Sequence, residues 1–198
     1  GMLSRYVANL PRAWRVSTLI VPLSLAAVGQ SPAQDWVFLI GGGDQADNSQ
    51  AQIEANTRWA REVLTGLPGE RRFSLYFTDG DDPAPDVTEW RRPPEHAGSM
   101  QPLARVLNAF WSNGQRFRNH TLGAVDGGTR SDLLSAALAE QLSAVEADDR
   151  LFLVFNGHGA WDRKDPLGNR IMLWDSTALN VRELRRIFDQ APADTALR

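Results

Sequence analysis

The chain has 198 residues, 42% of them hydrophobic, with 21 basic and 24 acidic side chains. That length and apolar content suffice for one domain with a sizeable core plus an extension. A formal net charge of −3 without a clustered basic face argues against nucleic-acid binding. The sequence contains no cysteine, so this chain supplies no disulfide, no thiolate metal ligand and no thiol nucleophile.

Residues 1–33 have the layout of a leader that is removed. Gly1, before the first methionine, is typical of a scar left by tag removal. Three arginines then precede an apolar segment, residues 16–28, followed by small residues where a signal peptidase could cut. The segment is shorter than the about 20 residues that a membrane helix needs. An amphipathic or buried N-terminal helix is the alternative, which Pro22 disfavours. We predict export, periplasmic or secreted, with a mature form that starts near Gln30 and has no stable membrane span.

From residue 34 onward, short apolar runs that end in glycine or aspartate alternate with stretches of helical periodicity. Apolar runs without polar alternation are typical of strands covered on both faces of a parallel sheet. We predict strands over residues 35–40, 71–78, 151–155 and 171–174. We predict helices over residues 49–67, 103–111, 129–145 and 179–190. This order of elements predicts an α/β fold with a mostly parallel sheet.

Local signals at the helix starts and in the middle of the chain add detail to this fold. Two predicted helices begin with the spacing of a capping box, Ser49 with Gln52 and Thr129 with Asp132. Over residues 84–128 proline is frequent and the periodicity loosens. We predict that this stretch is a solvated insert.

His158 is the leading candidate for a functional residue. It follows the most hydrophobic predicted strand, and ligands of open α/β sheets bind at the carboxyl ends of the strands. Gly157 and Gly159 on either side leave its ring and the nearby N–H groups accessible, which distinguishes it from His96 and His120. A histidine here can act as a general base toward a nucleophile, and the N–H of Gly159 can stabilise an oxyanion.

Other motifs in the sequence carry weaker signals. The glycine-rich loop 41–49 invites a nucleotide-binding interpretation, but it lacks the Walker lysine, and Asp44 and Asp47 would repel phosphate. We therefore interpret it as a wide active-site loop. The acidic stretch 79–82 lacks the ligand alternation of a calcium loop, no histidine spacing typical of a metal site occurs, and no GxSxG elbow is present. The sequence predicts no cofactor and no bound metal.

Two segments resemble a known family. The run DDRLFLVFNGHGAW, preceded by a helix that begins GGTRSDLLSAAL, resembles the histidine strand and preceding helix of caspase-like cysteine peptidases, which include legumains, caspases and metacaspases. The unit WVFLIGGGDQADNSQAQIEANTRWAREVL is similar to the first strand and helix of legumain-type members. The resemblance extends from Trp36 to the C-terminus. It implies that residues 34–198 are the N-terminal portion of a caspase-like three-layer α/β/α sandwich, incomplete at its C-terminus.

The resemblance also implies roles for three residues. His158 would be the catalytic histidine and Gly159 an oxyanion donor, while Asn48 would match an asparagine that orients the histidine in legumains. The substrate would be a peptide or protein. In that family the cysteine follows the next strand, and this chain has none.

Two functions follow from the missing cysteine. In the first, the chain is the histidine-bearing part of a cysteine endopeptidase and is inert alone. In the second, it is an exported, non-catalytic binding or scaffold domain. We favour the first, because losing a central strand would expose an apolar sheet edge.

Overall fold

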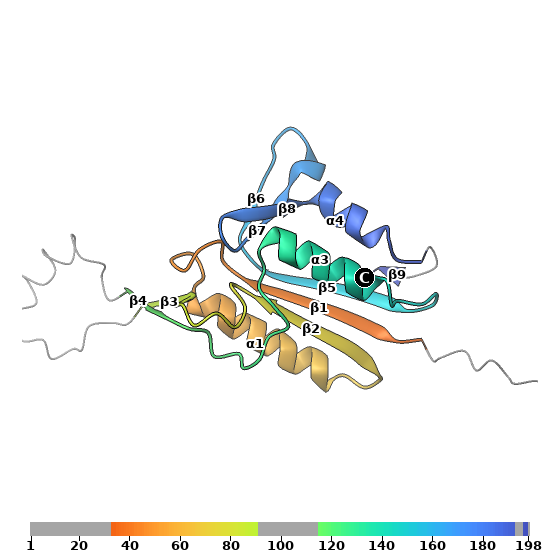
Figure 1. The fold of residues 1–198 in the computed structure, drawn as a ribbon, viewed down its shortest axis with the longest axis horizontal. Helices are drawn as coiled ribbons and strands as arrows, with labels where there is room; N and C mark the ends of the chain where they lie inside the picture. Colours follow the sequence, from red (N-terminus) through yellow and green to blue (C-terminus); the bar gives the residue numbers. More distant parts are fainter. Residues whose placement is uncertain (1–32, 91–114, 193–195, 198) are drawn as a thin grey trace, which may run out of the picture. The chain divides into compact units, whose positions relative to one another are not determined.

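The computed structural model describes residues 33–90 and 115–192 and the backbone of residues 196 and 197 (Figure 1). The predicted leader, except its last residue, and the helix predicted over residues 103–111 lie outside the described residues.

A parallel sheet with the strand order β2-β1-β5-β9 forms the centre of this part of the chain. Its strands are β1 (Asp35–Gly42), β2 (Arg71–Phe77), β5 (Arg150–Gly157) and β9 (Ala196–Leu197). β1 pairs with β2 and β5 along its length, whereas β9 pairs only with the first two residues of β5. The carboxyl ends of β2, β1 and β5 therefore lie together at one edge of the sheet.

Helices cover both faces of this sheet (Figure 1). Leu39 of β1 belongs to an apolar cluster with Ile53 of α1 (Ala51–Gly66). Phe38 and Ile40 belong to a second cluster with α3 (Ser131–Leu142) and α4 (Val181–Phe188). Alternate side chains of a strand point to opposite faces, so α1 lies on one face and the other two helices on the other. The prediction of a mixed α/β fold with a parallel sheet is confirmed.

A three-stranded antiparallel sheet follows β5. It has the order β6-β7-β8, and its strands are β6 (Gly159–Ala160), β7 (Arg170–Leu173) and β8 (Thr177–Asn180). The predicted start of the last helix at Leu179 is wrong, because Leu179 and Asn180 belong to β8. α4 begins one residue after Asn180, whose side chain accepts the N–H of Glu183 while Glu183 accepts the N–H of Asn180.

Neither predicted capping box forms, and at α3 a long-range contact takes its place. α1 starts after Gln50, whose side chain makes no cap bond, and the hydroxyl of Ser49 has no hydrogen-bond partner. α3 starts after Arg130, and the N–H of Ser131 donates to Thr177 Oγ1 of β8 at 2.9 Å. Both capping predictions are therefore wrong. At α3 the reason is that Thr177, far away in the sequence, accepts the donor at the helix start.

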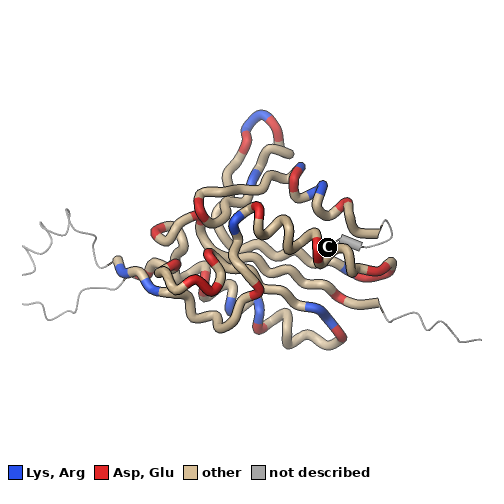
Figure 2. The backbone as a smooth tube through the Cα atoms, in the orientation of Figure 1, with Lys and Arg blue, Asp and Glu red and all other residues tan. Residues whose placement is uncertain are grey.

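In the described ranges, no helix is both long and apolar enough to cross a membrane. Basic and acidic residues are interspersed along the described backbone (Figure 2).

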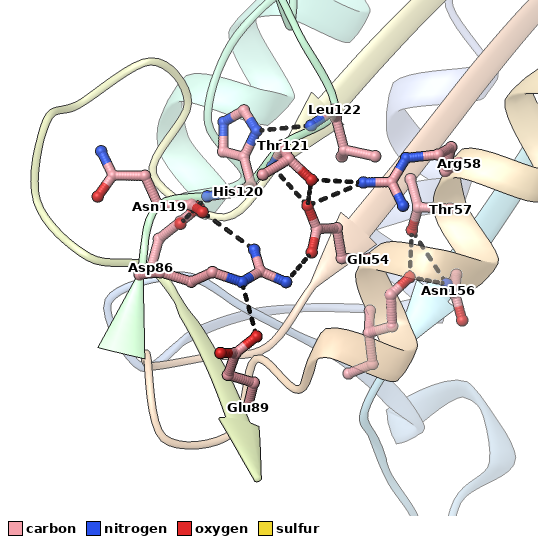
Figure 3. Close-up of polar contacts among 12 residues, drawn as sticks. Glu54, Thr57, Arg58, Asp86, Glu89, Asn119, His120, Thr121, Leu122 and Asn156 are labelled. Carbon is pink, nitrogen blue, oxygen red and sulfur yellow. Dashed lines mark hydrogen bonds and ion pairs between the residues drawn. The ribbon is translucent and has the colours of Figure 1, made fainter. Parts of the chain in front are cut away.

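The described parts of the predicted insert are only partly packed, since Trp90 and Phe117 are exposed while a short segment before them is buried. β3 (Val87–Trp90) and β4 (Gln115–Arg118) form an antiparallel pair, and Asp86, Val87 and Thr88 are buried. Figure 3 shows the polar contacts that hold this region against α1. The prediction of a solvated insert is wrong for residues 86–88 and Leu122, because the apolar residues of the insert are few and spaced by prolines, which hides their burial from periodicity.

Candidate functional site

His158 lies at the carboxyl edge of the parallel sheet, directly after β5. β1 and β5 are in register, so Gly42 lies opposite Gly157, and the loop after β1 runs beside the histidine. The ring Nε2 of His158 is 2.9 Å from the backbone carbonyl oxygen of Asn48 in that loop. The structure therefore brings together His158 and Asn48, two of the three residues singled out in the sequence.

The contact with Asn48 fixes which ring nitrogen carries the proton. A backbone carbonyl oxygen only accepts, so Nε2 of His158 must be the donor. In the neutral imidazole, Nδ1 is then the unprotonated nitrogen with a free lone pair. The ring is thus held in one tautomer, with its basic atom pointing away from Asn48.

The side chain of Asn48 has a different partner. Its amide Nδ2 donates to Asp44 Oδ1 at 2.8 Å within the same loop. The resemblance assigned the orientation of the histidine to an asparagine at this position, and here the backbone of that residue makes the contact. Sequence alone does not distinguish these two possibilities, because any residue at position 48 has a carbonyl.

Glycines let the loop pass close to its neighbours. A Cβ on Gly43 would lie 2.4 Å from the carbonyl carbon of Asn48, and one on Gly157 would lie 2.5 Å from the carbonyl oxygen of Gly42. A Cβ on Gly41 would likewise lie 2.4 Å from Thr57 Oγ1. Close approach of protein atoms, and not of a phosphate, therefore accounts for Gly41, Gly43 and Gly157.

Gly159 presents its backbone polar groups to the free side of β6. In the antiparallel β6-β7 ladder, the N–H of Met172 donates to the carbonyl of His158 at 2.8 Å. Hydrogen-bonded and non-bonded pairs alternate along such a ladder, so the next pair, Gly159 with Ile171, faces outward. Gly159 is also exposed. Its N–H can therefore donate to a ligand near His158.

The tip of the β7-β8 hairpin supports the loop that carries Asn48. Residues 174–176 connect the paired residues Leu173 and Thr177, and Asp175 and Ser176 have left-handed backbones, with φ of 61° and 55°. The N–H of Ser176 donates to the carbonyl of Asp44 at 3.1 Å, and Gln45 Nε2 donates to Ser176 Oγ at 2.7 Å. Sequence reasoning missed this support. An Asp-Ser pair between two apolar runs was the only local signal.

A second titratable cluster follows β2, on the far side of β1 from His158. Burial, followed by the nearby carboxylates of Asp86 and Asp82, raises the pKa of Asp79 to about 6. His120 lies beside it, with Nε2 3.0 Å from the carbonyl oxygen of Gly80. Among the residues that the structure describes, no group of three or more metal-ligating side chains could hold an ion.

Comparisons with protein-family models, curated proteins and solved structures give no match to this chain. The function must therefore be argued from the geometry at the sheet edge.

Proposed function

We propose that this chain is the histidine-bearing part of a caspase-like or legumain-like cysteine endopeptidase domain with a three-layer α/β/α sandwich fold. One observation carries the proposal. His158 lies at the carboxyl end of β5 with Nε2 2.9 Å from the carbonyl oxygen of Asn48, which leaves Nδ1 free as a base. The outward-facing N–H of Gly159 supplies an oxyanion donor next to that base.

The reaction would begin at the free ring nitrogen. Nδ1 of His158 accepts the proton of a thiol, and the resulting thiolate attacks the peptide carbonyl carbon. The N–H of Gly159 donates to the oxyanion that forms. The imidazolium returns the proton to the leaving amine, and water then hydrolyses the thioester by the reverse sequence of proton transfers. The Asn48 carbonyl stabilises the positive ring while Nδ1 holds the proton.

Among the described residues, no strand pairs with the side of β5 opposite β1 beyond Leu151, and this side indicates where the thiol would lie. β9 pairs in parallel with Arg150 and Leu151 at the start of β5. A strand that continued along β5 from Leu197 would reach the level of Gly157 after six more residues. Its carboxyl end would then lie beside His158. The sequence has no cysteine, so the proposal places the thiol on polypeptide outside this sequence.

The test uses the longest natural protein that includes this sequence. It is assayed against a panel of fluorogenic peptides with and without a thiol alkylator. We expect thiol-dependent cleavage that His158→Ala lowers by about a hundredfold or more, the usual contribution of a general base. His96→Ala serves as the control histidine. Cleavage that survives in His158→Ala, or no thiol-dependent cleavage at all, would overturn the proposal.

The second candidate is an exported, non-catalytic binding domain with the same fold, favoured by the absence of cysteine from the sequence. It predicts peptide binding without cleavage in the same panel.

The proposed export through residues 1–33 is tested by fractionating cells that express the chain with and without that segment. Retention of both forms inside the cell would contradict export.

A further inference from the structure

The loop between β6 and β7, residues 161–169, begins three residues after His158 and carries an exposed aromatic ring. Trp161 is 74% exposed, and the guanidinium carbon of Arg163 lies 5.4 Å from the centroid of its ring. A cavity of about 270 Å³ opens at this loop. Its lining residues are Trp161, Asp162, Arg163, Lys164, Gly168 and Arg170, which we call the Trp161 pocket.

The acidic residues of the loop already have hydrogen-bond or ion-pair partners within the protein. Asp162 Oδ1 accepts the backbone N–H groups of Lys164 at 2.9 Å and Asp165 at 3.3 Å. Asp165 forms an ion pair with Arg182. Figure 2 shows basic residues at the tip of this loop with acidic residues on either side. Within the described ranges, three basic side chains of the pocket make no ion pair: Arg163, Lys164 and Arg170.

The pocket is held in shape by backbone contacts. The N–H of Asp162 donates to Asn169 Oδ1 at 2.8 Å across the loop, and the N–H of Val181 donates to the carbonyl of Asn169 at 3.0 Å. A Cβ on Gly168 would lie 2.5 Å from Asp162 Oδ2, so the two sides of the loop are in close contact. A ligand would therefore meet a loop whose backbone is already held in place, which lowers the entropic cost of binding.

We propose that the Trp161 pocket binds an acidic segment of a polypeptide. Guanidinium and ammonium groups without an ion-pair partner favour carboxylates. The exposed ring of Trp161 can pack on the methylene groups of the Asp and Glu side chains that carry those carboxylates. Gly159 lies on the free edge of β6, two residues before Trp161, and its carbonyl can accept an N–H of an extended backbone, which favours a peptide over a free anion. The net charge of −3 disfavours nucleic acid. This binding does not depend on whether the chain takes part in cleavage.

The experiment measures binding of the full chain by fluorescence anisotropy at two salt concentrations. The probes are an extended peptide rich in Asp and Glu and the same peptide with Asn and Gln in their place. We expect the acidic peptide to bind more tightly and to weaken with salt. Arg163→Glu with Lys164→Glu should weaken it about tenfold or more, because like charges then face each other.

The matched control is Arg61→Glu with Arg116→Glu, which makes the same change in net charge on α1 and β4 and should leave binding within about twofold. Trp161→Ala should weaken binding of the acidic peptide without removing its salt dependence. Equal binding of the two peptides, equal loss in both double variants, or tighter binding of a single-stranded oligonucleotide than of the acidic peptide would each overturn the proposal.

Discussion

Asn48 contacts His158 through its backbone carbonyl, so the path of the loop matters more than the identity of the side chain at position 48. That path depends on Gly43, where a Cβ would collide with the backbone of Asn48. The side chain of Asn48 contributes only a contact with Asp44 inside the loop.

We therefore expect Asn48→Ala to keep His158 in the Nε2–H tautomer, and Gly43→Ala to move the Asn48 carbonyl and mix the two tautomers. Long-range proton–nitrogen NMR spectra of the histidine rings, recorded where imidazole is neutral, report the tautomer directly. Gly66→Ala is the control, since a Cβ there meets nothing within 4 Å. A mixed tautomer in Asn48→Ala alone would show that the side chain holds the ring.

Asp79 carries a destabilising charge at neutral pH. Burial, with a smaller contribution from Asp86 and Asp82, raises its pKa from 3.8 to about 6 in the folded chain. Between these two values the folded chain binds the proton and the unfolded chain has lost it, so stability falls as pH rises. The loss is complete above about pH 6.

Asp79→Asn should therefore stabilise the chain at pH 7.5 by roughly 1–2 kcal/mol, less than two pKa units imply because the side chain is partly exposed. The gain should vanish below about pH 3, where Asp79 is protonated in both states. Urea unfolding at the two pH values measures the difference. Asp81→Asn on the exposed part of the same loop is the control. A gain that persists at low pH would show that the buried charge of Asp79 is not its cause.

At the scale of elements, Glu54 joins α1 to the segment around β4 (Figure 3). Its carboxylate is 2% exposed and accepts Arg118 at 2.6 Å, the N–H of Thr121 at 2.5 Å and Arg58 at 3.1 Å. Burial by itself raises the pKa of Glu54, but the donors on Arg118 and Thr121 outweigh it and lower the pKa. The charged carboxylate therefore stabilises the packing of this region on α1.

Glu54→Gln should destabilise the chain by about 2–4 kcal/mol, because it leaves Arg118 and the Thr121 N–H facing an amide. Arg118 retains Glu89 at 3.2 Å, which limits the loss. Urea unfolding at pH 7 gives the change in free energy. Asp132→Asn, which removes an exposed pair with Arg130, should have a much smaller effect because water screens that pair. Equal effects of the two substitutions would contradict a structural role for Glu54.

At the scale of the whole molecule, the sheet is asymmetric. β1 is hydrogen-bonded on both sides along its length, whereas β5 beyond Leu151 has a described partner strand on only one side. The apolar residues 152–155 are only partly buried there. An apolar strand edge of this kind is a site for pairing with further polypeptide, as the proposed function requires.

Amide hydrogen exchange should show this asymmetry. All amides of β1 should be protected from exchange. Successive amides of a parallel strand point to opposite sides, so in β5 only the alternate amides of residues 152–157 that point toward β1 should be protected. NMR-detected exchange on dilute chain measures it. Protection of every β5 amide at low concentration would mean that the edge is covered. Protection that appears only on concentration would indicate pairing between copies.

The sequence by itself determined the long strands β1, β2 and β5, the presence of α1, α3 and α4, and the position of His158 at a strand end, because apolar periodicity and glycine or proline breaks are local signals. It could not locate the burial of Asp86 and Val87, the cap that Thr177 provides for α3, or the turn at Asp175 and Ser176 that supports the glycine loop. Above all, only the tertiary structure decided that the backbone of Asn48, and not its side chain, holds the histidine. These features join residues tens of positions apart, and no local pattern records which distant group meets a given donor.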